Sequence, residues 1–159
     1  MRRRFSKNEI RKYMRKCIYL ALQSPEEIGK PLVGSLVLSR DKEIVGKGYK
    51  DFIVGTQKLV HSERKALYDA EEMARQGYLF TLLEPCIRIR RNQILKPCSE
   101  LIVERGIDTV VIGLLDRYSG SMKAGQGVRY LTSRGVNVMI YHCFNDDMLR
   151  LIMPNMVHG

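Results

Sequence analysis

The chain has 159 residues, 45% of them apolar and 28% charged, with a formal net charge of +10 at pH 7. This length fits one domain that spans residues 1–159 and buries a core, and the composition excludes a low-complexity or fibrous chain. The sequence holds no apolar run of about 20 residues and no apolar secretory segment after its basic start, so we expect an intracellular, cytoplasmic protein without membrane partners.

The first predicted helix spans residues 7–23. Ser6 is its predicted N-cap, and Glu9 completes a capping box by reaching back to the N-cap backbone. Basic residues fill much of the outer face of this helix, and a basic surface favours phosphate-bearing partners. The alternative is a face that is only solvated. Apolar residues recur at helical spacing and predict a buried stripe: Ile10, Met14, Cys17 and Ala21.

Two strand-like segments follow, at residues 32–39 and 43–50, and the turn between them predicts a hairpin. A helical pattern then begins at His61 and ends at Gly77. The short apolar run at residues 78–83 is typical of a buried strand.

The second half of the chain alternates between helices and strands. A helix begins after Pro97 and ends at Gly106, and a strand follows at residues 109–115. Residues 124–134 predict a helix and residues 136–143 the last strand, with a short helix after it. Strands separated by single helices pair in parallel, and the hairpin is antiparallel. We therefore expect an α/β fold of three layers, α/β/α, with a mixed five-stranded sheet.

The four cysteines fall into two pairs. Cys17 and Cys143 lie among apolar residues, and we expect them to be buried as small hydrophobes. Cys86 and Cys98 each follow a proline directly. We expect no disulfide framework in an intracellular protein.

His61, Cys86 and Cys98 form a candidate zinc site. His61 opens a helix, Cys86 follows a strand and Cys98 opens the next helix, so all three fall at neighbouring strand ends. Zinc prefers histidine and cysteine ligands, and a catalytic site leaves its fourth position open. Glu63 is close enough in sequence to move a proton from water to a leaving nitrogen. The alternative is that the three are core or loop residues that bind no metal.

Five segments resemble motifs of the cytidine-deaminase-like zinc deaminases, most closely the pyrimidine deaminase domain of riboflavin biosynthesis. The resemblance covers roughly residues 10–141, and the 159 residues do not include the reductase domain that is usually fused to that deaminase. The segments are "KPLVGSLVLSRDKEIVGKGY", "HSERKAL", "LLEPC", "KPCSELIVERGIDTVVIGLLD" and "GQGVRYLTSRGVNV".

The resemblance implies a zinc-dependent hydrolytic deaminase that releases ammonia from an aminopyrimidine nucleotide or nucleoside. It implies that His61, Cys86 and Cys98 bind Zn²⁺, that Glu63 shuttles protons, and that the backbone amide of Cys86 helps to place the attacking water. It also implies a homodimer or homotetramer.

Three departures from the riboflavin-type pattern concern the substrate. Lys30 and Lys65 stand where that pattern has asparagines. The loop between the cysteines, residues 87–97, has eleven residues and either binds a substrate phosphate or covers a subunit interface. We therefore expect substrate-binding roles for five cations: Lys30, Lys65, Arg88, Arg90 and Arg91.

Two other functions compete with the first. The basic N-terminal helix and the arginine loop favour a base in RNA or DNA as the substrate, although the loop offers no aromatic residue for stacking. A non-catalytic zinc-containing binding protein would have the same fold, but it would have no need of Glu63.

Overall fold

The computed structural model describes residues 5–29, 31–88, 95–117, 123–142, 144, 145, 149, 150 and 152. Its helices are α1 (Lys7–Ala21), α2 (Ser62–Ala70), α3 (Cys98–Glu104) and α4 (Gln126–Ser133), with 3-10 helices η1 (Glu26–Ile28) and η2 (Glu71–Ala74). Its strands are β1 (Gly34–Leu38), β2 (Ile44–Tyr49), β3 (Asp51–Phe52), β4 (Leu59–Val60), β5 (Tyr78–Leu83), β6 (Thr109–Leu114) and β7 (Asn137–Ile140).

Five strands form one mixed sheet in the order β2-β1-β5-β6-β7. β1 pairs antiparallel with both β2 and β5, whereas β5–β6 and β6–β7 are parallel. The expected parallel pairing across a single helix is therefore wrong for β2 and β5, because β1 lies between them. Burial gives the reason: β1 is buried at every position, whereas β2 has the partly exposed pattern of an edge strand.

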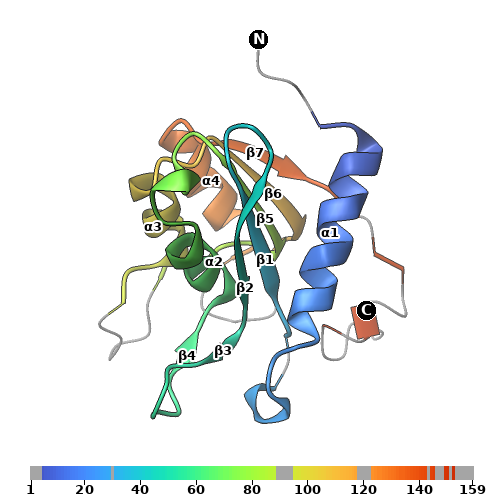
Figure 1. The fold of residues 1–159 in the computed structure, drawn as a ribbon, viewed down its shortest axis with the longest axis vertical. Helices are drawn as coiled ribbons and strands as arrows, with labels where there is room; N and C mark the ends of the chain where they lie inside the picture. The colour runs from blue at the N-terminus through green and yellow to red at the C-terminus, as the bar shows by residue number, and fades with distance from the viewer. Residues whose placement is uncertain are drawn as a thin grey trace.

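Helices cover both faces of this sheet, which confirms the predicted three-layer α/β/α architecture (Figure 1). On one face, α1 packs Met14 and Cys17 against a cluster that includes Leu36 and Phe80. On the other face, α2, α3 and α4 pack around a second cluster that includes Leu67 and Ile102.

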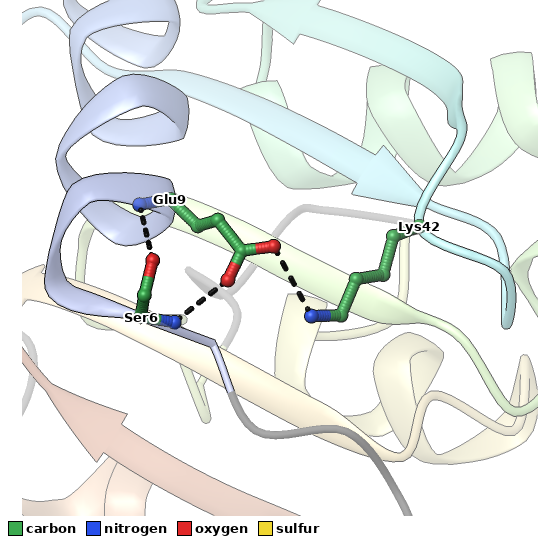
Figure 2. A network of polar contacts seen from close by, with 3 residues as sticks. All are labelled: Ser6, Glu9 and Lys42. Carbon is green, nitrogen blue, oxygen red and sulfur yellow. Dashed lines mark hydrogen bonds and ion pairs between the residues drawn. The ribbon is translucent and has the colours of Figure 1, made fainter.

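The predicted capping box of α1 is present (Figure 2). The Ser6 side chain accepts a hydrogen bond from the backbone N–H of Glu9, and the Glu9 carboxylate accepts one from the backbone N–H of Ser6. The Glu9 carboxylate also pairs with Lys42 at 3.3 Å. This pair ties the start of α1 to the turn between β1 and β2.

Two glycines of β2 allow α2 to approach the sheet closely. A Cβ atom on Gly46 would lie 2.1 Å from the carbonyl oxygen of Ala66, and one on Gly48 would lie 2.2 Å from that of Ser62. Real Cβ contacts are never this short, so only glycine permits this packing. The beginning of α2 is thereby fixed against the edge of the sheet.

Several boundaries differ from those expected. α1 ends at Ala21 rather than at residue 23, and β7 ends at Ile140 rather than at residue 143. The short pair β3–β4 was not predicted, because strands of two residues carry no periodic pattern. Cys17 is fully buried as expected, whereas Cys143 lies outside the described residues. In the part of the chain that the structure describes, no helix is both long enough and apolar enough to cross a membrane.

Candidate metal and deaminase site

The structure brings His61, Cys86 and Cys98 together. The Nδ1 atom of His61 lies 3.6 Å from Sγ of Cys86 and 3.5 Å from Sγ of Cys98. The three candidate ligand atoms all lie within 4.8 Å of one another.

These distances fit a tetrahedral zinc ion. Zn–S distances of about 2.3 Å and Zn–N distances of about 2.0–2.1 Å at tetrahedral angles place sulfur and nitrogen ligands about 3.5 Å apart. The two measured S···N distances, 3.6 Å and 3.5 Å, agree with this separation. Two thiol sulfurs and one imidazole nitrogen are also the donor types that zinc prefers, and three of them leave a fourth position open.

Local structure explains why these side chains converge. His61 is the N-cap of α2, with an extended backbone and no hydrogen bond from its side chain to the helix. Cys98 is the first residue of α3, and its backbone N–H donates to Sγ of Cys86 at 3.3 Å. Ser99 ties the start of α3 to the segment after β5, because its backbone N–H donates to the Cys86 carbonyl and its hydroxyl to the Pro85 carbonyl.

The two thiols shift each other's pKa in opposite directions. The hydrogen bond with Cys98 is the main cause that lowers the pKa of the Cys86 thiol to about 4, and the contact with His61 adds to it. The same hydrogen bond, together with burial, raises the pKa of the Cys98 thiol. A lowered thiol pKa suits metal binding, because cysteine binds a metal in its deprotonated form.

Glu63 is buried beside this cluster. Burial raises the pKa of its carboxyl group, against the attraction of His61. The Ser62 hydroxyl donates to Oε2 of Glu63 at 3.3 Å, and its oxygen lies 2.7 Å from the Ser35 hydroxyl. Ser35 in turn donates to Oγ1 of Thr81 at 2.9 Å. A buried chain of hydroxyls therefore leads from the sheet to the carboxylate.

Lys50 is a candidate site residue that the sequence did not reveal. It follows β2, and its Nζ atom donates to the Pro31 carbonyl at 3.1 Å. Burial lowers the pKa of Lys50, and the Glu63 carboxylate raises it. This electrostatic influence of Glu63 makes Lys50 a candidate for the site. No sequence signal marked Lys50, because only the fold of the β2 end brings it there.

Arg64 is a second residue that sequence reasoning missed. Its side chain is buried, although it lies on the helix that carries His61. Its guanidinium donates to the Tyr68 hydroxyl at 3.0 Å and to the carbonyl of Lys96, two residues before Cys98. Arg64 thus links α2 to the segment that presents Cys98.

The predicted substrate cations have different surroundings. Lys65 forms an ion pair with Asp51 at 2.9 Å and lies over the ring of Tyr49, so its charge is already compensated. Arg88 is exposed and lines the same small pocket as the three candidate ligands. The other three lie outside the described residues: Lys30, Arg90 and Arg91.

Glu84 holds the backbone next to the candidate site through three hydrogen bonds. Its side chain is 2% exposed, and its Oε2 atom accepts hydrogen bonds from the backbone N–H groups of Asp116 and Gly125, both at 3.0 Å. Its Oε1 atom accepts from the N–H of Val128 at 3.1 Å. Glu84 therefore fixes the end of β6 and the start of α4 beside the Pro85–Cys86 segment.

The sequence and the fold are similar to those of known deaminases. Residues 7–114 match the model of one protein family, the "cytidine and deoxycytidylate deaminase zinc-binding region". The riboflavin biosynthesis protein RibD of Synechocystis sp. is 36% identical over 132 residues, which cover 80% of this chain and 32% of that protein. The chain spans about a third of the length of the RibD proteins that it matches.

Two further relatives are similar over comparable regions. The diaminohydroxyphosphoribosylamino-pyrimidine deaminase of Buchnera aphidicola is 33% identical over 110 residues, which cover 69% of this chain and 68% of that protein. A solved structure from Thermotoga maritima, a diaminohydroxyphosphoribosylaminopyrimidine deaminase/5-amino-6-(5-phosphoribosylamino)uracil reductase, has a TM-score of 0.69. It is 29% identical, and the match covers 89% of this chain and 38% of that one.

Proposed function

The chain belongs to the family of the cytidine and deoxycytidylate deaminase zinc-binding region, and from this we propose that it is a zinc-dependent hydrolytic deaminase of an aminopyrimidine. One observation carries the proposal. The His61 nitrogen lies from each of two cysteine sulfurs at the distance that a tetrahedral zinc site requires, and a buried carboxylate belongs to the residue two positions after the histidine.

His61, Cys86 and Cys98 would hold the ion. When bound, zinc would supply a Lewis acid that lowers the pKa of water toward neutrality. Glu63 would take a proton from the attacking water and return it to the ring or to the departing amine, so that nitrogen leaves as ammonia. Burial favours this role, because it raises the pKa of the Glu63 carboxyl group and so makes its carboxylate a stronger base.

The remaining chemistry concerns the orientation of the substrate. The Ser62 hydroxyl would hold one carboxylate oxygen of Glu63, leaving the other for the proton transfer. Lys50 would donate a hydrogen bond to a carbonyl or phosphate oxygen of the substrate, in exchange for its contact with Pro31. Arg88, at the rim of the pocket, is placed to bind a phosphate group.

The names of the relatives support a phosphoribosylated aminopyrimidine as the substrate, because the Buchnera protein is named as a deaminase of such a compound. Within this proposal Lys65 is a structural residue, since Asp51 already neutralises its ammonium group. The homodimer or homotetramer that the family resemblance implies stays a prediction.

Ammonia release tests the proposal. The purified chain is loaded with one equivalent of zinc and incubated with cytosine, cytidine, deoxycytidylate, a diaminohydroxyphosphoribosylaminopyrimidine and single-stranded oligonucleotides. We expect about one zinc ion per chain and ammonia from a monomeric pyrimidine. Zinc binding without ammonia from any compound would favour the non-catalytic alternative, and ammonia only from oligonucleotides would favour a nucleic-acid base as the substrate.

A further inference from the structure

The outer face of α1 has no role in the site described above. α1 lies on the opposite side of the sheet from α2, α3 and α4, and Ile152 near the C-terminus packs into the same core cluster (Figure 1). β2 is the edge strand that it contacts. The exposed face of the helix is rich in cations, which follow one another along its length: Lys7, Arg11, Lys12, Arg15 and Lys16. A helix of 15 residues is about 22 Å long, so these cations form an extended basic surface.

A groove continues this surface onto the sheet. It has a volume of about 480 Å³, and Arg15 and Lys16 of α1 face Lys47 of β2 across it. Tyr19 lines the groove and is 74% exposed, whereas Leu36 is buried at its floor. The groove therefore combines three cations with one freely accessible aromatic ring.

The positive charge that α1 contributes to this groove is only weakly offset by acids of the same helix. Glu9 is the only acidic residue of α1, and its carboxylate is already bound by the Ser6 backbone and by Lys42 (Figure 2). None of the ion pairs found between described residues includes Arg15, Lys16 or Lys47. Asp69 of α2 keeps its negative charge beside β2, where its carboxylate accepts from the backbone N–H of Lys47, so the charge of Lys47 is partly offset.

We propose that the groove between α1 and β2 binds single-stranded nucleic acid. Arg15, Lys16 and Lys47 would contact successive phosphates, and a base would stack on the Tyr19 ring, which is the usual combination in sequence-independent single-strand binding. A two-fold contact centred on this surface would bring the cations of one copy close to those of the other, so the surface favours a polyanion over a second copy of the chain.

This surface is distinct from the candidate metal site. The groove shares no lining residue with the pocket that contains His61, Cys86 and Cys98. α1 also covers the face of the sheet opposite to α2 and α3, whose first turns carry His61 and Cys98 (Figure 1). Binding at the groove is therefore independent of the proposed deaminase activity, and the two proposals fail separately.

Fluorescence anisotropy tests the proposal with fluorescein-labelled 20-residue oligo(U) and oligo(dT), on the full chain at 50 and 200 mM salt. We expect the double variant Arg15→Ala/Lys16→Ala to bind at least tenfold more weakly. A plot of log K against log salt concentration should have a slope smaller in magnitude by about 1.4 for this variant. Each lost phosphate contact to a single strand reduces that slope by about 0.7, and the variant loses two contacts. Tyr19→Ala should weaken binding at least fivefold, and Tyr19→Phe should restore it.

The matched control is Arg129→Ala/Arg134→Ala, which removes two exposed cations from α4 on the other face of the sheet. We expect this variant to bind almost as tightly as the wild type, and all variants to keep the wild-type circular dichroism spectrum and zinc content. Equal losses in the two double variants would overturn the proposal. So would no binding at 50 mM salt, or tighter binding of poly-glutamate or of phosphatidylserine vesicles than of either oligonucleotide.

Discussion

The Sγ atom of Cys98 lies 3.5 Å from Nδ1 of His61, although 37 positions separate the two residues in the sequence. Neither side chain reaches this contact through a local turn. His61 is placed by the close packing of α2 on β2, and Cys98 by the hydrogen bonds that tie α3 to the end of β5. The geometry of the candidate zinc site is thus a product of the whole sheet.

Replacement of Cys98 tests the ligand set. We expect Cys98→Ala to reduce the zinc content from about one ion per chain to less than about 0.1 ion per chain. The two remaining ligands would bind zinc too weakly to retain it, because zinc sites in proteins use three or four protein ligands. Cys17→Ala is the control, since this thiol lies on the buried side of α1, in the core cluster on the other face of the sheet from α2 and α3. The measurement is metal content after dialysis against a weak chelator. Zinc retained by Cys98→Ala at the wild-type level would exclude Cys98 as a ligand.

Gly48 tests the packing that positions α2. A Cβ atom at this position would lie 2.2 Å from the Ser62 carbonyl oxygen and 2.7 Å from the Ala66 nitrogen. Because both atoms belong to the backbone, we expect Gly48→Ala to lower the free energy of unfolding by about 1–3 kcal/mol or more and to weaken zinc binding. Urea unfolding measures the first effect. Val54→Ala, at a site that is 97% exposed, should leave both quantities unchanged.

Glu9 gives a pH-dependent prediction. The backbone hydrogen bond from Ser6, helped by Lys42, lowers the pKa of its carboxyl group below 4.5. A carboxyl group with a lowered pKa stabilises the folded state above its unfolded pKa, and this contribution is lost as the pH falls through its folded pKa. We expect Glu9→Gln to cost less than about 1 kcal/mol at pH 7, since the pair is partly exposed.

Urea unfolding of the wild type and of Glu9→Gln between pH 7 and pH 3 checks this dependence. The difference between them should shrink toward pH 3 and should also shrink in high salt. Glu26→Gln, an exposed residue of η1, is the control. A difference that stays constant across the whole pH range would show that the Glu9 charge contributes nothing.

Glu84 tests the support of the segment around Cys86. The buried Glu84 carboxylate accepts hydrogen bonds from three backbone N–H groups. Replacement by glutamine removes one of its two acceptor oxygens. We expect Glu84→Gln to lower the free energy of unfolding by about 1–3 kcal/mol, because a buried N–H loses its partner. Thermal unfolding measures the change. Glu104→Gln, which breaks only an exposed pair with Lys96, should have an effect several times smaller, and equal effects would contradict the assignment.

Much of this fold could be predicted from local patterns. The capping box of Ser6 and Glu9 and the apolar run of β5 lie where the sequence places them. The order of strands could not be predicted in the same way, because pairing depends on contacts between distant segments. The full burial of β1, which lies between β2 and β5, becomes evident only once α1 and α2 cover its two faces.

Some residues of the candidate site could be predicted from the sequence, and others could not. His61, Glu63, Cys86 and Cys98 carry a recognisable spacing, so the sequence predicts them together. Lys50 has no such spacing, and only the end of β2 brings its ammonium group toward Glu63.

Arg64 and Lys65 show why neighbouring residues on one helix differ in role. Arg64 turns inward toward the segment that carries Cys98, and Lys65 pairs with Asp51. The sequence alone assigned a substrate contact to Lys65 and none to Arg64.

The most direct test of the proposed function is ammonia release by zinc-loaded wild type and by Glu63→Gln, with zinc content measured on the same samples. The variant keeps the size of the side chain and one acceptor oxygen for the Ser62 hydroxyl, but it cannot carry the proton. We expect it to hold about one zinc ion per chain and to release ammonia at least a hundredfold more slowly than the wild type. Ammonia release at the wild-type rate by Glu63→Gln would contradict the proposed mechanism.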